Sequence, residues 1–214
     1  MDAATIQARI YAGYAKVALR IGFSADQYRP ATALNPTAIG NKLRSIPASF
    51  NAEDMTYSKP NKYGKATWFG LFDGRLTAPG DYLKNTQDGT FFIAAQQTNL
   101  PILLVSCNAV VDIHRPQQQS GVGTLSYGGN TAATESALMA QWPCSILQSG
   151  KGDKDLLLPG DVKSPQWSIL LPYFAGVTLR TADIILDNLA RRYIVNSAEL
   201  TDLGWRITAA QAQT

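Results

Sequence analysis

Short segments of strand character, separated by turn dipeptides, fill the chain from residue 66 onward and restrict what it can fold into. Four segments are rich in aromatic and branched apolar residues: 66–72, 79–84, 90–97 and 101–115. Turn dipeptides punctuate them: Asp73-Gly74, Pro79-Gly80 and Asp88-Gly89. This alternation is typical of antiparallel hairpins, and Asp-Gly is a strong hairpin signal. We therefore predict a first β module over residues 66–115, with Phe92, Ile93, Leu103 and Val105 in its core.

A second block of the same character covers residues 143–214. We predict its strands at 144–148, 166–171, 176–181, 183–187, 191–197 and 203–209. The intervening residues 116–142 are rich in Gln, Gly and Thr at first, and we predict a loop excursion there with a short helix over 133–141. The fold class is therefore mainly β, with two small antiparallel barrel-like modules. We expect Ile185, Tyr193, Val195 and Trp205 in the core of the second module.

The two blocks resemble each other. Residues 80–107 and 182–209 each begin with a small residue and Asp, then continue with two apolar residues, a polar turn and an aromatic strand. Phe91-Phe92-Ile93 corresponds in this comparison to Tyr193-Ile194-Val195. An internal duplication explains the similarity, and the alternative is that any two hairpins look alike. We carry the duplication forward as a hypothesis.

The N-terminus predicts a helix that Asp2 begins and that Gly22 ends in a left-handed conformation. Apolar residues recur on it at three- and four-residue spacing and form one stripe: Ile6, Ile10, Tyr14, Val17 and Ile21. Two interpretations stay open, because the stripe suits packing on the chain's own barrel and docking on another subunit. We take these five residues as candidate subunit contacts.

Residues 23–65 contain four prolines and little periodicity, so we predict an irregular arm and a first region spanning 1–65. The arm is rich in basic residues that are further contact candidates: Lys42, Arg44, Lys59, Lys62 and Lys65. A solvated loop is the simplest interpretation, and contact with an acidic partner or nucleic acid is the alternative. We expect this arm and residues 116–135 to make contacts between subunits.

Charged residues make up only 16% of the chain, against about 25% in an ordinary soluble domain. A weakly charged surface is easier to explain when neighbouring subunits cover part of it.

One histidine and two cysteines supply too few ligands for a usual zinc site, so we expect no metal and no cofactor. No apolar run approaches the length of a membrane span, and the N-terminus lacks a secretory signal pattern. We read Cys107 and Cys144 as thiols, with a disulfide as the alternative.

The residues that could carry catalysis are poorly placed for it. His114 is the only imidazole base, and an odd separation from Cys107 puts the two side chains on opposite faces of a shared strand. The candidate carboxylates sit at turn positions, where aspartate is favoured for local hydrogen bonds: Asp73, Asp81, Asp88, Asp183 and Asp187. We therefore predict no enzymatic activity.

Aromatic residues are the last candidates for a binding site. They occur in both blocks: Trp68, Phe69, Phe72, Phe91, Phe92, Trp167, Tyr173, Tyr193 and Trp205. Core packing is the ordinary role for such residues, whereas a platform for sugars or nucleic acid needs several exposed on one face.

The C-terminal segment carries a resemblance. Its pattern is Leu171-Pro172, then Asp183, then Tyr193-Ile194-Val195, and finally Gly204-Trp205. In this order it resembles the small barrel proteins of tailed bacteriophages that build the neck, the tail completion ring or the junction of tail tube and baseplate. Residues 80–101 look like the same kind of unit.

The resemblance implies a structural virion subunit of a contractile-tailed bacteriophage, made in the host cytoplasm and located in the tail or neck. Its expected partners are other copies of itself in a ring and other tail, baseplate or neck proteins, with DNA contact as a lesser alternative and no membrane. A carbohydrate- or ligand-binding β module that uses exposed aromatics is the second hypothesis for the function.

Overall fold

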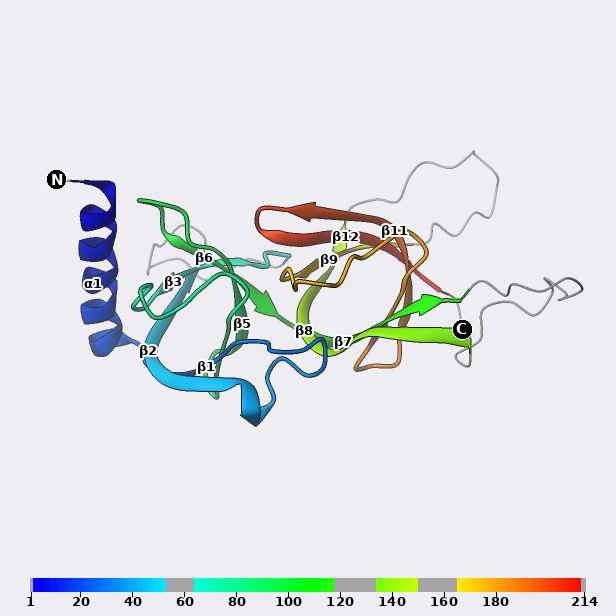
Figure 1. The fold of residues 1–214 in the computed structure, drawn as a ribbon, viewed down its shortest axis with the longest axis horizontal. Coiled ribbons are helices and arrows are strands. Elements are labelled where there is room, and N and C mark those ends of the chain that lie inside the picture. The colour runs from blue at the N-terminus through cyan, green and yellow to red at the C-terminus, as the bar shows by residue number, and fades with distance from the viewer. Residues whose placement is uncertain (1, 53–63, 118–133, 150–164, 213–214) are drawn as a thin grey trace, which may run out of the picture.

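The computed structural model describes residues 2–52, 64–117, 134–149 and 165–212. One helix precedes two six-stranded β-barrels that follow each other along the long axis of the molecule (Figure 1). The first barrel contains β1 (Phe23–Tyr28), β2 (Lys42–Ala52), β3 (Thr67–Leu71), β4 (Tyr82–Asn85), β5 (Gly89–Ala95) and β6 (Ile102–Cys107). The second contains β7 (Ala109–Pro116), β8 (Glu135–Ser149), β9 (Gln166–Leu171), β10 (Ile184–Asp187), β11 (Arg192–Thr201) and β12 (Gly204–Gln211). A short 3-10 helix, η1 (Ile39–Asn41), leads into β2.

The two barrels have one strand order. The first closes as β1-β2-β3-β6-β5-β4, and the second as β7-β8-β9-β12-β11-β10, with antiparallel pairing throughout. Both have a bulge at the same point of the fifth strand, after Ile93 and after Val195. The mainly β fold with an N-terminal helix and two barrel modules is confirmed, and the modules repeat each other in structure.

The start of the first barrel was predicted wrongly. Residues 23–28 and 42–52, which the sequence indicated to be irregular, form β1 and β2. Their inward-facing residues include Ala25, Gln27 and Ala48, which are buried but carry little apolar signal. The first barrel therefore begins at Phe23 and not at residue 66, since strand pairing overrides weak local patterning.

Three further boundaries differ from the prediction. The segment 101–115 divides at Asn108 into β6 and β7, which belong to different barrels. Residues 135–141 of the helix predicted over 133–141 belong to β8, because pairing with β7 outweighs the helix-forming composition around Met139. Residues 176–181 form a loop and not a strand.

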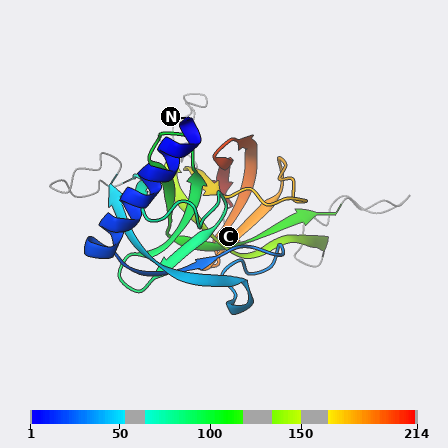
Figure 2. The ribbon, with the colours of Figure 1, turned by 60° about the vertical axis from the view of Figure 1, so that its left-hand side comes forward.

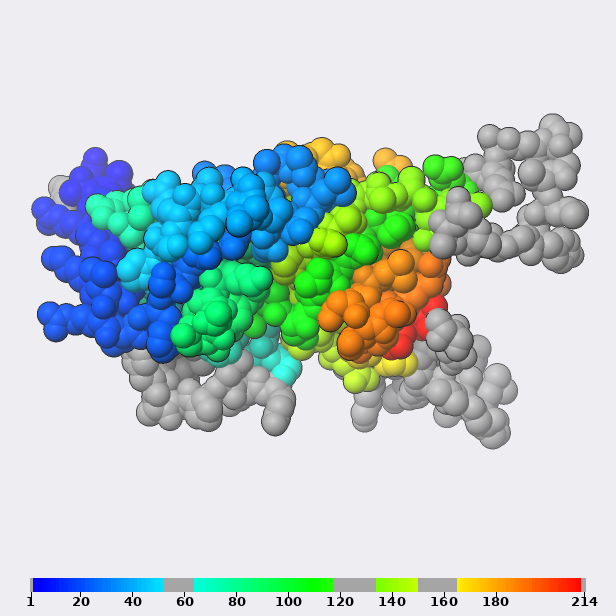
Figure 3. All heavy atoms as spheres, turned by 90° about the horizontal axis from the view of Figure 1, so that it is seen from below, coloured from blue at the N-terminus to red at the C-terminus, as the bar shows by residue number. Residues whose placement is uncertain are grey.

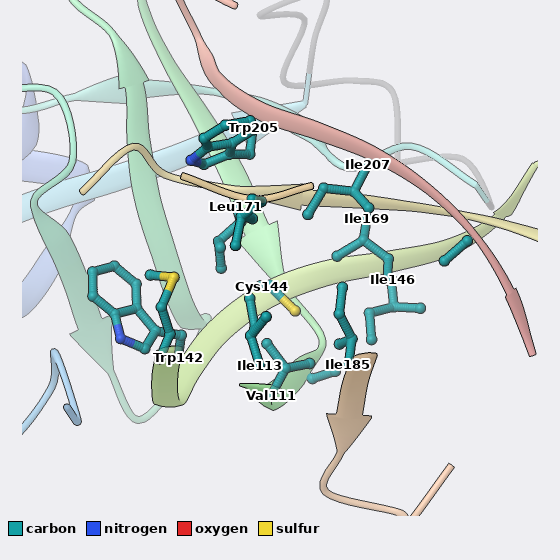
Figure 4. Close-up of a cluster of buried hydrophobic side chains, with 14 of the residues drawn as sticks. Val111, Ile113, Trp142, Cys144, Ile146, Ile169, Leu171, Ile185, Trp205 and Ile207 are labelled. Atoms are coloured by element: carbon teal, nitrogen blue, oxygen red, sulfur yellow. The ribbon is translucent and has the colours of Figure 1, made fainter. Parts of the chain in front are cut away.

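The interior of the first barrel is filled by Phe72, which follows β3, and by alternate residues of the strands: Ala25, Ile46, Ala48, Leu83, Phe91, Ile93, Ile102 and Leu104. We expected Phe92, Leu103 and Val105 in this core, but they have the opposite parity and point out of the barrel, where they pack against the second barrel. The predicted core of the second barrel is correct, because Ile185, Tyr193, Val195 and Trp205 are all buried there. Figure 4 shows Ile113, Ile169, Ile185 and Ile207 converging in that interior.

Helix α1 (Ala3–Ile21) lies across the outer end of the first barrel (Figure 2). Asp2 caps it by accepting a hydrogen bond from the Thr5 N–H at 2.9 Å, as predicted. Gly22 ends it, but in an extended conformation (φ −92°) and not a left-handed one. Glycine is needed because a Cβ there would lie 2.5 Å from the Ala48 carbonyl oxygen on β2.

Tyr11 and Ala18 form the buried face of α1. The Tyr11 ring belongs to the core cluster of the first barrel, and a Cβ on Gly74 would lie 2.7 Å from it. Ile10 and Tyr14 are partly buried beside it. The helix therefore closes the barrel end.

Among the described residues, no helix is long and apolar enough to cross a membrane.

Candidate assembly surfaces

The aspartates that we considered for catalysis are occupied in structural contacts. Asp81, just before β4, is 1% exposed and accepts two hydrogen bonds from the Arg29 guanidinium, at 2.7 and 2.8 Å. It also accepts from the Gln27 amide and from the Ala78 backbone N–H. These contacts join the end of β1 to the turn that begins β4.

The second barrel repeats this arrangement. Asp183 accepts two hydrogen bonds from Arg115, at 2.8 and 2.9 Å, and one from the Arg180 backbone N–H at 2.7 Å. Gly80 and Ala182, the residues before the two aspartates, both have positive φ and both donate to the fifth strand of their barrel. Asp81 and Asp183, which lie at the start of the two similar sequence blocks, therefore hold the same turn in each barrel.

Asp187 is also structural. Burial favours its neutral form, but hydrogen bonds from the Arg191 backbone and side chain and from the Leu189 N–H outweigh this and lower the pKa of Asp187. Tyr193 donates to the same carboxylate at 3.1 Å. Burial, followed by the charge of Asp187, raises the pKa of Tyr193 to about 12. This carboxylate closes the β10–β11 turn.

Asp73 and Asp88 also lie at turns. The Arg75 guanidinium, which hydrogen-bonds Asp73, is the main cause of the lowered pKa of Asp73. Asp88 is held by the side chain of Asn85. Each of the five candidate carboxylates thus has local partners that account for its position.

The histidine and the two cysteines do not form a reactive group. Cys107 lies on β6 and His114 on β7, so they belong to different barrels and not to one strand. Cys107 and Cys144 are free thiols, and burial raises the pKa of both. Within the described ranges no group of three or more His, Cys, Asp or Glu residues could hold a metal ion.

The aromatic residues mostly pack inside the barrels. Trp68 meets Phe91 edge-on at a centroid distance of 5.8 Å, and Trp167 meets Tyr193 in the same way at 5.7 Å. The two pairs occupy equivalent positions, and both indole N–H groups are buried with no hydrogen-bond partner among the described residues. Trp205 is only 5% exposed. These side chains do not form the exposed platform that sugar binding would need.

The helix residues that we took as contact candidates divide into two groups. Ile10 and Tyr14 pack on the first barrel. Ile6, Val17 and Ile21 are 39–46% exposed along one side of α1, and we call these three residues the α1 flank. Leu19 is also exposed, on another side of the helix. The structure thus favours the first interpretation for part of the stripe, and the flank remains partly exposed among the described residues.

The basic candidates do not form a single patch within the described residues. Lys42 pairs with Asp26 on the neighbouring strand at 2.7 Å, and this contact is the main cause of the lowered pKa of Asp26. Arg44 is exposed on β2, and Lys65 is exposed just before β3. Lys59 and Lys62 lie outside the described residues, as do the glycines of the predicted loop 116–135.

The segment between β1 and β2, residues 29–41, reaches across to the second barrel (Figure 3). Leu34 forms a parallel bridge with Ala140 on β8, and the Ala33 carbonyl accepts a 2.6 Å hydrogen bond from the Trp142 indole. Asn35 and Ala140 add further backbone hydrogen bonds. This segment therefore joins the two barrels of one chain, and contact of the arm with another subunit stays a prediction.

Four outward-facing residues of the first barrel form one cross-strand row that packs under the second barrel. We call them the inner row: Tyr28, Tyr82, Phe92 and Val105. Tyr82 donates to the Pro143 carbonyl oxygen at 2.8 Å and meets Trp142 edge-on. The interface between the barrels is therefore apolar and aromatic, with this hydrogen bond at its centre.

The same row exists on the second barrel. The corresponding residues, which we call the outer row, are His114, Ile184, Ile194 and Ala210. Ile194 holds the position of Phe92, yet it is 43% exposed where Phe92 is 1% exposed. His114 and Ala210 are half-buried. Ile184 is only 3% exposed, so Ile194 is the one exposed member of the outer row, whereas the inner row is buried except for Tyr28, which is partly buried.

A groove also lies between the tip of the β11–β12 hairpin and the first barrel. It is lined by Pro79, Gly80, Tyr173, Leu200 and Leu203, among others. Tyr173 and Leu200 are about half exposed there. Gln97 of the first barrel meets Asp202 of the hairpin across the same seam.

Comparisons with known proteins give no guide to these surfaces. No family model matches the chain, and neither a curated protein nor a solved structure is similar enough to count as a match. The function must be argued from the fold and the surfaces described above.

Proposed function

We propose that this chain is a structural subunit of a tailed-bacteriophage virion, which forms a ring with other copies of itself in the neck, the tail or the baseplate junction. The observation that carries the proposal is the tandem of two barrels with one strand order, together with the exposed apolar side chains of Ile194 and the α1 flank among the described residues. A chain of this kind presents different apolar surfaces at different places, which suits heterologous contacts between copies.

The resemblance to phage barrel proteins supports the same proposal. The residues that carry it lie in the second barrel: Leu171 ends β9, Asp183 holds the turn before β10, Tyr193 is on β11 and Trp205 is on β12. Tyr193 and Trp205 are buried. The pattern therefore describes how such a barrel folds, and the exposed positions between the buried ones remain available for assembly.

The experiment that tests the proposal follows the chain into particles. A tagged copy is expressed during phage production in a host that carries the gene, and purified particles are examined by immunogold electron microscopy. We expect label at the neck, the tail or the baseplate, and tails or heads that fail to join when the gene is deleted. Infectious particles that lack the chain would contradict the proposal.

A glycan array on the purified chain tests the competing function. The only described aromatics among the exposed large apolar residues are Phe23 and Tyr173, of which Tyr173 lines the groove between the barrels. Specific glycan binding that is lost in Tyr173→Ala, together with unlabelled particles, would replace the virion role with the binding role.

A further inference from the structure

The segment between β1 and β2 ends in an apolar tip whose backbone is held in place. Ile39 on η1 is 89% exposed, more than any other large apolar side chain of the described residues. The Asn41 amide donates to the carbonyl oxygens of Asn35 and Pro36, at 3.1 and 3.2 Å. The backbone carbonyl of Asn41 accepts from the Arg29 N–H at 2.9 Å. A loop that is already fixed loses little conformational entropy on binding, so the η1 tip is suited to contact with another molecule.

The groove beside the β11–β12 hairpin is suited to receive such a side chain. Ile93 and Pro172 line it and are buried, whereas Tyr173, Leu200 and Leu203 line it and are 38–52% exposed. These three side chains gather exposed apolar surface in one concave place. An aliphatic side chain that entered the groove would cover that surface and its own, at about 1.5–3 kcal/mol for each side chain fully buried.

The tip and the groove also carry opposite charges. Arg44, near the start of β2, is exposed and has no ion-pair partner among the described residues, whereas its neighbour Lys42 is paired with Asp26. Asp202 lines the groove, is exposed, and meets the Gln97 amide at 3.4 Å but no cation of the described chain. The two surfaces are therefore complementary in charge as well as in apolar character.

The two surfaces lie on opposite edges of the molecule, near the junction of the barrels. In Figure 1 the bend of the β11–β12 hairpin lies at the upper edge and the blue segment near residue 40 at the lower edge, and Figure 2 agrees. The tip of one copy thus faces away from its own groove and can enter only the groove of another. Repetition of such a contact closes a ring when the rotation between copies allows it.

We infer that Ile39 of one copy inserts into the groove between the barrels of the next copy, so that copies join side by side. Arg44 of the first copy pairs with Asp202 of the second at the rim of the groove. The contact is heterologous, because the η1 tip and the groove are different surfaces of one molecule. The inference deepens the proposed function and rests on it, since it names the contact by which the ring forms.

The test uses the full-length chain, with sedimentation velocity as the readout over a range of concentrations. Ile39→Asp places a carboxylate on the tip, and Leu200→Asp places one in the groove. Each should weaken association by about 100-fold or more, because an unpaired charge would be buried in the contact. Leu189→Asp is the matched control and should leave association unchanged, since Leu189 is 65% exposed in the β10–β11 turn and lies on neither surface. Circular dichroism confirms that each variant keeps the fold.

Two further measurements identify the geometry of the contact. A mixture of Ile39→Asp and Leu200→Asp retains one intact groove and one intact tip per pair, so we expect heterodimers and no larger species. Arg44→Asp and Asp202→Arg should each weaken association by about 10-fold, because each brings like charges together. The chain that carries both changes should recover most of the wild-type association.

Three results would overturn the inference. The first is a wild-type chain that stays monomeric at the highest concentrations reached. The second is an assembly that Ile39→Asp and Leu200→Asp leave intact, in which case the copies join elsewhere and the proposed virion role still stands. The third is a double charge variant that associates no better than the single ones, which would exclude the pairing of Arg44 with Asp202. The particle-labelling experiment decides the virion role separately, because it does not depend on which surface makes the contact.

Discussion

At the scale of single residues, the repeated Asp–Arg pairs are the most informative feature of the molecule. Asp81 with Arg29 and Asp183 with Arg115 join the end of the first strand to the turn before the fourth in each barrel. The sequence identified both aspartates as turn residues, correctly. It could not identify the arginines as their partners, because Arg115 lies far from Asp183 in the chain and only strand pairing brings them together.

Arg115→Ala should destabilise the chain by about 3 kcal/mol, because it leaves the carboxylate of Asp183 buried without its cation. The matched control is Arg206→Ala, whose pair with Glu199 is exposed on both sides and should contribute less than about 1 kcal/mol. Urea unfolding of the two variants gives both values. Equal losses would show that the buried pair has no special role.

Asp187 predicts a defined dependence of stability on pH. Its pKa in the folded chain is lower than usual, so its contribution is present above about pH 4 and is lost as the pH falls through the folded value. Asp187→Asn should therefore be less stable than the wild type at pH 7, and the gap should narrow toward pH 3. Thermal unfolding across this range measures the gap, and a constant gap would contradict the assignment.

At the scale of elements, α1 shows how far a periodic pattern can be trusted. The pattern predicts the helix and its capping residue correctly. It predicts a stripe of five residues that includes neither Tyr11 nor Ala18, and these two are the buried residues of the helix. Apolar periodicity reports which side chains prefer burial, but it does not tell which neighbour provides it. The sequence could therefore identify the apolar residues of the α1 flank, but it could not show that they stay exposed among the described residues.

Tyr11→Ala should destabilise the chain by about 3–5 kcal/mol, because Tyr11 closes the end of the first barrel and its removal leaves a cavity. Val17→Ala on the exposed flank should change the stability by no more than about 0.5 kcal/mol. Chemical denaturation of the two variants at low protein concentration separates packing on the barrel from contact between copies. A large effect of Val17→Ala under these conditions would show that the flank packs within the chain.

The strands were predicted correctly where the local sequence signal is strong and missed where it is weak. The β4–β5 hairpin and most of the last four strands were predicted because their turns and apolar residues are strong local signals. Strands β1 and β2 were missed because small or polar residues occupy most of their buried positions, with Ile46 as the exception. The parity of β5 was misjudged, since Phe91, Phe92 and Ile93 are all buried and only the second barrel explains why Phe92 is. The outer row was invisible for the same reason, because its four residues come from four strands.

At the scale of the whole molecule, the two barrels are joined by more than a linker. The inner row is buried under the second barrel, and the segment between β1 and β2 pairs with β8. Asn108, the single residue between β6 and β7, exchanges hydrogen bonds with the backbone of Ile146. These contacts involve residues of both barrels, so the loss of either barrel exposes apolar surface on the other.

We therefore expect the wild-type chain to unfold in one cooperative transition, with the slowest-exchanging amides of both barrels sharing one free energy of opening. Trp142→Ala should uncouple the barrels. The indole lies against Tyr82 and Phe174 and donates to Ala33, so its removal costs about 3–5 kcal/mol at the junction itself.

Trp205→Ala is the control for this variant, because it removes a side chain of the same size from the second barrel. It should lower the stability by a similar amount, and both barrels should still unfold together because the junction is intact. Hydrogen exchange read by mass spectrometry compares β4–β6 with β9–β12 in the same sample. Separate opening free energies in Trp142→Ala and a shared one in Trp205→Ala would establish that the junction couples the barrels. Two separate values already in the wild type would mean that each barrel folds independently and that the repeat is a pair of autonomous domains.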